Sequence, residues 1–154
     1  MGRTSLKNIK IIASIYKEIH KLPRMPQTKP IVNIVNVVSS ASIDQKMDLV
    51  KIDEKFPETE YNPEQFPGLV FRLTTPKTAT LIFRTGKMVC TGAKSEELSI
   101  TAVNTVVQKL RKAKIKIKKD AIISVQNIVS SISLGGKIHL EKAARTLPRS
   151  MYEP

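Results

Sequence analysis

"NVVSSASIDQKMDL" occupies residues 36–49 and "NIVSSISLGGKIHL" occupies residues 127–140. The two stretches lie 91 positions apart, and their alignment continues without a gap over residues 31–63 against 122–154. Twelve of these 33 aligned positions are identical, whereas unrelated segments of average composition would share about two or three. The sequence therefore predicts a duplicated structural unit whose second copy is incomplete.

The first copy is long enough for its elements to be predicted. Residues 31–43 are β-branched and alternating, which predicts a strand, and residues 47–56 predict a short helix that Pro57 ends. Residues 95–113 begin with Ser95 and an acidic first turn and predict an amphipathic helix of about five turns. Between the helices, three strands separated by turns are predicted in "GLVFRLTT" (68–75), "TATLIFRTG" (78–86) and "KMVCTGA" (87–93).

The second copy repeats only the strand, over residues 121–134, and the short helix, over residues 139–147. The strand is expected to pair beside strand 31–43, whereas the helix is expected to have little to pack on. Between the copies, "KLRKAKIKIKK" (109–119) carries seven basic residues in eleven and is interpreted as a helix end followed by a solvated connector.

The order strand, helix, meander, long helix predicts an α+β fold of two layers, in which one face of the sheet carries helices and the other is bare. The predicted domains are an N-terminal basic extension (1–30), a first repeat (31–118) and a partial second repeat (119–154).

Net charge narrows the class of partner. The chain carries +13 at neutral pH, which makes nucleic acid the first partner to consider. The charge is concentrated at the ends, because residues 1–30 carry +6, residues 31–108 carry −1 and residues 109–154 carry +8. Contacts of the middle segment with a polyanion must therefore be local. A basic segment over residues 1–30 also fits simple solvation.

Other classes of function lack the residues that they require. No apolar run approaches the ~18 residues that span a bilayer, and no secretory signal is recognisable. Cys90 is the only cysteine and is expected to be a buried strand residue, and His20 and His139 lack the spacing of a metal site. No metal or other cofactor is predicted. Without paired carboxylates on strands or a His-based site, the chain is predicted not to be an enzyme, and an intracellular location is the plain interpretation.

Strand alternation separates a uniformly apolar face from a mixed one. Leu69, Phe71 and Leu73 share a face and are predicted to be core, whereas Val70 and Arg72 share the opposite face. A face that is apolar yet carries a cation packs poorly against a helix and suits a surface that meets a polyanion. In the next two strands, alternation separates Leu81 and Phe83 from Ile82, and Val89 and Thr91 from Met88 and Cys90.

Several phrases of the chain resemble one protein family. They are "EYNPEQFPGLVFRL" (60–73), "TATLIF" (78–83) and "GKMVCTGAKSEE" (86–97), together with the gapless duplication. Over residues 31–154 the chain resembles the TATA-box-binding proteins of transcription initiation, and the wording is most similar to that of archaeal members. The resemblance implies a saddle-like fold, in which a curved antiparallel sheet carries helices on its convex face. It also implies that the concave face binds the minor groove of A·T-rich promoter DNA.

The resemblance implies roles for individual residues. Phe66 and Phe83 match an aromatic pair that wedges between base pairs and bends the DNA, a mode for which TATA-box-binding proteins are themselves the standard example. Asn36 and Asn127 match two central asparagines, whose amides can donate to adenine N3 or thymine O2. The family has an apolar floor that disfavours the guanine amino group. Its residues correspond here to Val38, Leu81, Val89, Thr91 and, in the second copy, Val129. Arg72, Lys77 and Lys87 match residues that contact phosphates. Such contacts position the protein on the DNA without recognising its sequence.

The leading interpretation is therefore a general transcription initiation factor. Promoter DNA, transcription factor B and the RNA polymerase machinery are the implied partners, although in the family the loop that docks factor B belongs to the part of the second repeat that is absent here. The implied location is the cytoplasm in association with the nucleoid for an archaeal chain, or the nucleus for a eukaryotic one.

Two alternatives remain open from the sequence. The chain is either a fragment of a longer protein or a shortened paralogue that self-associates or captures transcription partners as a regulator. The two-layer unit also fits an accessory nucleic-acid-binding module of an enzyme. Residues 1–24 are either a partner-binding extension or precede a natural start at Met25.

Overall fold

The computed structural model describes residues 30–154, which form two compact units. The larger unit comprises residues 34–131, and the smaller unit comprises residues 30–33 and 132–154. The predicted basic extension over residues 1–30 thus lies outside the described residues, apart from Pro30.

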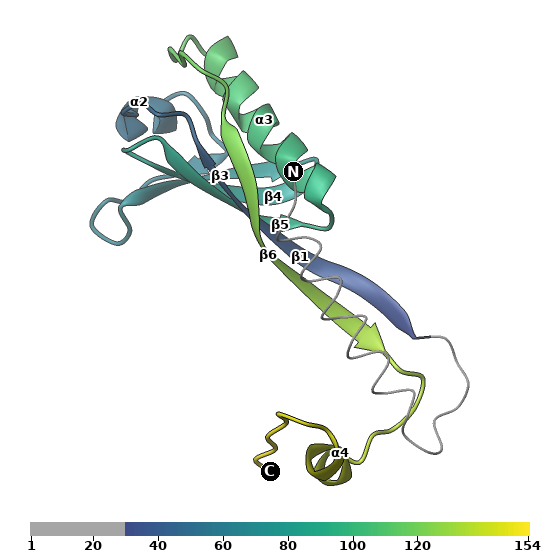
Figure 1. The fold of residues 1–154 in the computed structure, drawn as a ribbon. Helices are drawn as coiled ribbons and strands as arrows, with labels where there is room; N and C mark the ends of the chain where they lie inside the picture. Colours follow the sequence, from purple (N-terminus) through teal and green to yellow (C-terminus); the bar gives the residue numbers. More distant parts are fainter. Residues whose placement is uncertain (1–29) are drawn as a thin grey trace. The chain divides into compact units, whose positions relative to one another are not determined.

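The sheet, most of which belongs to the larger unit, has the strand order β2-β3-β4-β5-β1-β6 (Figure 1). The pairs β2–β3, β3–β4, β4–β5 and β5–β1 are antiparallel. The strands are β1 (Ile31–Ser42), β2 (Thr59–Glu60), β3 (Gly68–Thr74), β4 (Lys77–Phe83), β5 (Lys87–Ala93) and β6 (Ile122–Ser133), and the helices of this unit are α2 (Leu49–Asp53) and α3 (Glu96–Lys112).

Both helices begin at capping side chains that satisfy free backbone donors. The Ser95 hydroxyl accepts from the Leu98 N–H at 3.1 Å, so α3 begins where the sequence predicts. Asp48 Oδ1 accepts from the Lys51 N–H at 3.2 Å at the start of α2. This helix begins after the predicted residue 47, because the Met47 N–H donates to the Arg84 carbonyl at 2.9 Å and is tied to the β4–β5 turn instead, and it ends at Asp53 rather than at the predicted residue 56.

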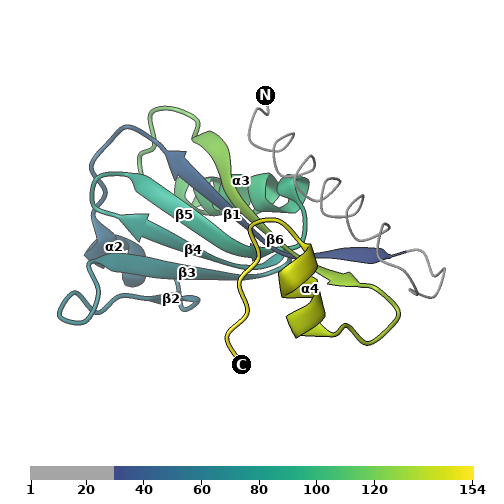
Figure 2. The ribbon, with the colours of Figure 1, turned by 60° about the horizontal axis from the view of Figure 1, so that its bottom comes forward.

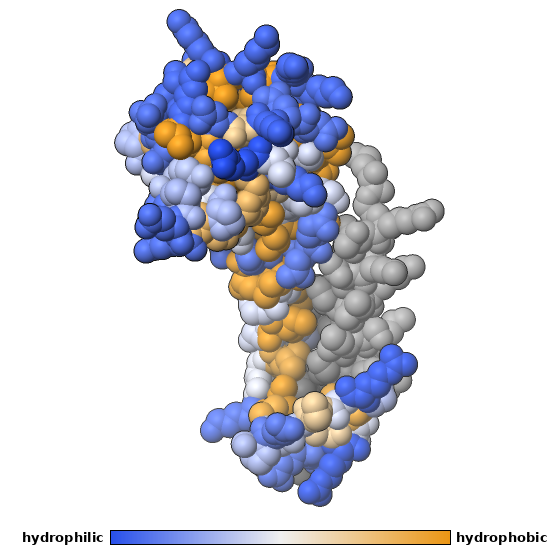
Figure 3. Space-filling view, turned by 90° about the vertical axis from the view of Figure 1, so that its left-hand side faces the viewer, coloured by the Kyte–Doolittle hydropathy of each residue, from blue (hydrophilic) through white to orange (hydrophobic). Residues whose placement is uncertain are grey.

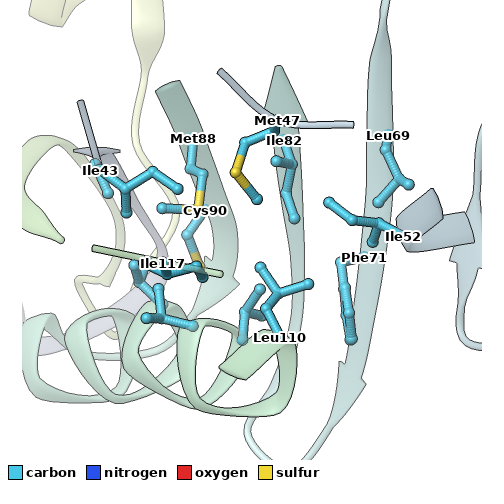
Figure 4. Close-up of a cluster of buried hydrophobic side chains, with 14 of the residues drawn as sticks. Ile43, Met47, Ile52, Leu69, Phe71, Ile82, Met88, Cys90, Leu110 and Ile117 are labelled. Atoms are coloured by element: carbon cyan, nitrogen blue, oxygen red, sulfur yellow. The ribbon is translucent and has the colours of Figure 1, made fainter. Parts of the chain in front are cut away.

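The core lies between the helices and one face of the sheet. Phe71 and Ile82 project from β3 and β4 toward Leu110 of α3, and Met88 and Cys90 extend the cluster from β5 (Figure 4). The predicted core residues Leu69, Phe71 and Leu73 are all buried, and the prediction for Cys90 is confirmed. Figure 2 shows the opposite face of β3, β4 and β5, which neither α2 nor α3 covers. We call this surface the open face.

The connector after α3 differs from its prediction. Ile117 is buried in the core cluster and Ile115 packs against that cluster. Gln45 holds the segment in place, since its Nε2 donates to the Lys116 carbonyl at 2.7 Å and its Oε1 accepts from the Lys118 N–H at 3.0 Å. The alternation of isoleucine and lysine explains the error, because extended chain places the isoleucines on one side and the lysines in solvent.

The strand and the short helix predicted for the second copy are both present. β6 neighbours β1 in the sheet, and Gln126 Nε2 donates to Ser40 Oγ at 2.8 Å within the larger unit. The helix α4 (Leu140–Thr146) belongs to the smaller unit, and none of its side chains is buried. The chain after α4 returns to it, because Ser150 Oγ donates to the Ala144 carbonyl of that helix at 2.7 Å.

Across residues 30–154, no helix combines the length and the apolar character needed to cross a bilayer. The same residues contain no group of three His, Cys, Asp or Glu side chains placed to hold a metal ion.

One ion pair joins α3 to the segment before β2. Lys109 Nζ lies 2.5 Å from Glu58 Oε1 and 5.8 Å from the centroid of the Phe71 ring. The hydrogen bond from Lys109 is the largest cause that lowers the pKa of Glu58 below its ordinary 4.5. A lowered pKa means that the pair stabilises the fold above the ordinary glutamate pKa and loses this effect as the pH falls through the lower, folded-state pKa.

Replacing Glu58 by glutamine is therefore expected to lower the melting temperature at neutral pH and to have a smaller effect at about pH 3, below the ordinary glutamate pKa. The loss should be about 1 kcal/mol or less, because both side chains are partly exposed. Thermal unfolding of both proteins at the two pH values measures it. Glu60→Gln is the matched control, because the Arg72–Glu60 pair is far more exposed. An equal difference at both pH values would contradict the expectation.

Candidate nucleic-acid interface

The strand register aligns open-face side chains into rows across the sheet. Val70 lies opposite Leu81, Leu81 lies opposite Val89, and Val89 lies opposite Ser40. These side chains are half-buried and alternate with fully buried core residues, so they point away from the helices. Val38 and Thr91 are half-buried in the same way. The structure thus brings together the first-copy residues predicted to form the floor: Val38, Leu81, Val89 and Thr91.

Phe66 and Phe83 meet at one end of this floor. Their ring centroids are 5.9 Å apart and the ring planes are inclined at 64°, an edge-to-face arrangement that aromatic pairs favour. Phe83 is half-buried on the open face and outside the core cluster, and the Phe66 side chain remains 39% exposed. Two hydrogen bonds shape the loop that carries Phe66: its N–H donates to the Asn62 carbonyl at 2.9 Å, and Asn62 Oδ1 accepts from the Glu64 N–H at 3.2 Å.

Gly68 lies beneath these rings and was missed by the sequence analysis. It pairs with Phe83 in the β3–β4 register. A Cβ at this position would lie 2.6 Å from Cε1 of Phe66 and 3.0 Å from Cε1 of Phe83. The available signal was its even spacing from Val70 and Arg72, which assigns it to the open face.

Asn36 is held by two neighbours on β5. Its Oδ1 accepts from the Gly92 N–H at 2.7 Å, and its Nδ2 donates to Thr91 Oγ1 at 3.1 Å. Both partners face Asn36 because the β1–β5 register shifts between Val37 and Ser39, and Gly92 adopts the left-handed φ of +95° that such a bulge requires. The Gly92 N–H sets the orientation of the amide, and Nδ2 keeps a second hydrogen for a ligand.

The predicted cations lie around the open face and are exposed. Lys77 and Lys87 begin β4 and β5. Arg72 Nη2 contacts Glu60 Oε2 at 3.2 Å in an exposed ion pair, a kind of interaction that contributes little and exchanges readily. Arg72 and Lys77 also line a depression of about 640 Å³ that contains Asn36 and Lys94. Lys94 was not predicted, and its Nζ donates to the Val35 carbonyl at 2.7 Å.

The two second-copy residues lie on the strand next to β1 in the sheet. Asn127 and Val129 are on β6, and both side chains are exposed, Val129 by 43%. β6 is the last strand of the sheet in the described chain, so the floor assigned to the second copy consists of this strand alone. Hydrophobic side chains at the surface are visible in Figure 3 among hydrophilic ones. The exposed large hydrophobic residues include Ile34, Val35 and Val129.

Comparisons with known proteins give similar sequences and a similar fold. The model of a family described as transcription factor TFIID, or TATA-binding protein (TBP), matches residues 31–113. The TATA-box-binding protein of Pyrodictium occultum is 50% identical over 128 residues, which cover 83% of this chain and 64% of that protein. The corresponding protein of Sulfurisphaera tokodaii is 44% identical over 133 residues, with coverages of 86% and 67%.

A solved structure, Methanococcus jannaschii TBP, superposes with a TM-score of 0.71 and 42% sequence identity, over 80% of this chain and 70% of that chain. It supports the predicted fold class, a curved antiparallel sheet with helices on one face. The chain spans about two thirds of the length of the curated relatives that it matches, 64% of the first and 67% of the second.

Proposed function

The chain belongs to the TATA-box-binding protein family, and on that premise we propose that it is a general transcription initiation factor which binds and bends A·T-rich promoter DNA through its open face. The family consists of transcription factors and not of enzymes. The observation that carries the proposal is the pair of Phe66 and Phe83 rings, which meet beside an apolar floor on a sheet face that the helices leave uncovered.

The floor supports a preference for A·T pairs. In the minor groove, A·T pairs present only the acceptors adenine N3 and thymine O2, whereas G·C pairs add the guanine amino group. Against Leu81 and Val89 that amino group would be buried without a partner, which costs free energy. The free hydrogen of Asn36 Nδ2 supplies a donor to the acceptors of an A·T pair. The proposed recognition of DNA sequence therefore consists mainly of the exclusion of guanine from the minor groove.

The aromatic pair supplies the bending step. Rings placed at the end of a floor can enter a base step and partly unstack it, and the resulting kink lets more of the groove contact the sheet. TATA-box-binding proteins are themselves the standard example of this mode, in which unstacking of a base step is offset by wider contact with the bent DNA. Arg72, Lys77 and Lys87 are placed to contact phosphates and set the register of the duplex. Arg72 would exchange Glu60 for a phosphate at small cost.

The direct test is titration of labelled duplexes with the full chain. We expect an A·T-rich duplex to bind more tightly than a G·C-rich duplex of equal length. Affinity should fall with salt, by about one power of ten per tenfold salt for each phosphate contacted. Resonance energy transfer between dyes at the duplex ends reports bending. Equal affinity for both duplexes, or no measurable binding, would refute the proposal.

Replacing Thr91 by valine is expected to weaken the preference for A·T pairs rather than the fold. Valine keeps the shape of threonine but removes the oxygen that accepts from Asn36 Nδ2, so the amide keeps only its contact with Gly92. The loss should be about 1 kcal/mol in the difference between A·T and G·C binding. Competition titrations measure this difference, and Thr74→Val, the same change at an exposed threonine of β3, is the control. An unchanged preference would show that the Asn36 anchor plays no part in recognition.

We also propose transcription factor B and the RNA polymerase machinery as partners, as expected of an initiation factor in this family. Addition of purified factor B to the chain on an A·T-rich duplex tests this. In native gel electrophoresis, a ternary complex that migrates more slowly than the complex of chain and duplex is the expected result. An unchanged mobility of the complex of chain and duplex would contradict it.

A further inference from the structure

We propose that Gly68 is a positioning residue of the aromatic pair, because the side chain that it lacks makes the space that the Phe66 and Phe83 rings occupy. The consequence for DNA bending rests on the proposed function. The arrangement of the rings does not, and it can be tested in the protein alone.

The steric evidence concerns one missing atom. Leu69, the next residue of β3, is buried in the core, so a Cβ on Gly68 would project onto the open face. It would lie 2.6 Å from Phe66 Cε1, 3.3 Å from Phe66 Cζ and 3.0 Å from Phe83 Cε1. Non-bonded carbon atoms settle at about 3.5–4.0 Å. An alanine at this position therefore requires a ring to move.

The backbone does not explain the glycine. Among the described glycines, those with positive φ are Gly86, Gly92 and Gly135, so Gly68 has a φ that other residues adopt freely. Glycine at this end of β3 also loses more conformational freedom on folding than other residues would. Gly68 is nevertheless buried while it faces the open side. Its contacts with the Phe66 and Phe83 rings account both for the presence of a glycine at this position and for its burial.

Phe66 is the ring that would move. Phe83 ends β4, which is paired along its length with β3. Phe66 lies on the loop before β3, is 39% exposed and makes the shorter contact with the added atom. The expected effect of Gly68→Ala is therefore displacement of the Phe66 ring from Phe83, with the core unchanged. The variant would keep both aromatic residues, but their rings would no longer be in contact.

The first test measures the rings without DNA. In the full chain, nuclear Overhauser effects between the Phe66 and Phe83 rings are expected in the wild type and lost in Gly68→Ala. Contacts between Phe56 and Phe71, whose centroids are 5.1 Å apart in the core, should persist and report the fold. Gly136→Ala is the matched control, because Gly136 is exposed and outside the positive-φ set. Persistence of the Phe66–Phe83 contacts in Gly68→Ala would overturn the inference.

The second test uses a double-mutant cycle on DNA. Gly68→Ala is expected to reduce duplex bending and to weaken A·T-rich binding about twofold to tenfold, the range of a displaced side chain. In a Phe66→Ala background the added methyl group has no Phe66 ring to displace, so Gly68→Ala should add little. Equal effects of Gly68→Ala in both backgrounds would contradict the proposed role.

The outcomes separate the two proposals. If the wild type bends DNA and Gly68→Ala bends it equally, the role of Gly68 is wrong and the proposed function stands. If the wild type does not bind DNA, the proposed function is wrong and the ring contacts still decide the role of Gly68. Should Gly68→Ala fail to fold, Phe66→Ala/Gly68→Ala is expected to fold. Failure of both would show that the collision with the Phe66 ring is not the cause.

Discussion

Replacing Phe83 by alanine is expected to abolish most of the bending of an A·T-rich duplex while changing the free energy of unfolding only slightly. The Phe83 ring lies on the open face, outside the core cluster, where its neighbours include Phe66 and Gly68. Stacking of one aromatic ring on a base is worth about 1–3 kcal/mol, so affinity should fall by about that amount. Resonance energy transfer across the duplex measures bending, and denaturant unfolding measures stability.

Phe83→Leu is the control for this change, because leucine keeps an apolar side chain on the floor and removes the aromatic stacking surface. We expect its bending to lie between that of the wild type and that of Phe83→Ala. Phe66→Ala should act in the same direction, and the double change should lose less than the sum, since the two rings form one pair. Undiminished bending by Phe83→Ala would refute the proposal that the aromatic pair bends the duplex by entering a base step.

Replacing Phe71 by alanine is expected to have the opposite pattern. This ring is 0% exposed, packs 5.1 Å from the centroid of Phe56 and lies under the Lys109 ammonium. Its removal should cost about 3–5 kcal/mol of stability through lost burial and the cavity left behind. That is a large share of the ~5–15 kcal/mol typical of a domain. Denaturant unfolding measures the loss, and duplex bending per folded molecule should be retained.

Phe71→Leu is the matched control, because a smaller change in volume at the same site should cost roughly 1–2 kcal/mol. Phe71 and Phe83 lie on adjacent strands and opposite faces of the same sheet, so the two alanine substitutions should separate stability from bending. If Phe83→Ala destabilised the protein more than Phe71→Ala, the assignment of the two faces would be wrong.

Much of the fold could be predicted because its signals are local. Alternation along β3 assigned Phe71 to the core and Arg72 to the open face, and both assignments are confirmed. Ser95 and the acidic residues after it predicted the start of α3. The family was recognisable because "GKMVCTGAKSEE" and the duplication are specific combinations. The assigned DNA contacts, including Asn127 and Val129 on β6, remain predictions that the titrations address.

Other features depend on segments that are distant in the chain. The bulge at Gly92, which directs Thr91 and its own N–H to Asn36, is a property of the pairing between β1 and β5. Ile117 was assigned to solvent because its lysine neighbours dominate the local composition, whereas the space beside Leu110 and Cys90 determines its burial. Neither the bulge nor that space has a signal within a short window of sequence.

The sequence by itself determined the repeat, the two faces of the meander and the residue types available on each face. It could do so because strand and helix periods are properties of consecutive residues. Only the tertiary structure decided which of those side chains meet. The placement of the Phe66 ring beside Phe83 depends on the loop hydrogen bonds at Asn62, the β3–β4 register and the missing Cβ of Gly68 acting together. Contact distances of this kind arise from packing between segments and have no counterpart in the order of residues along the chain.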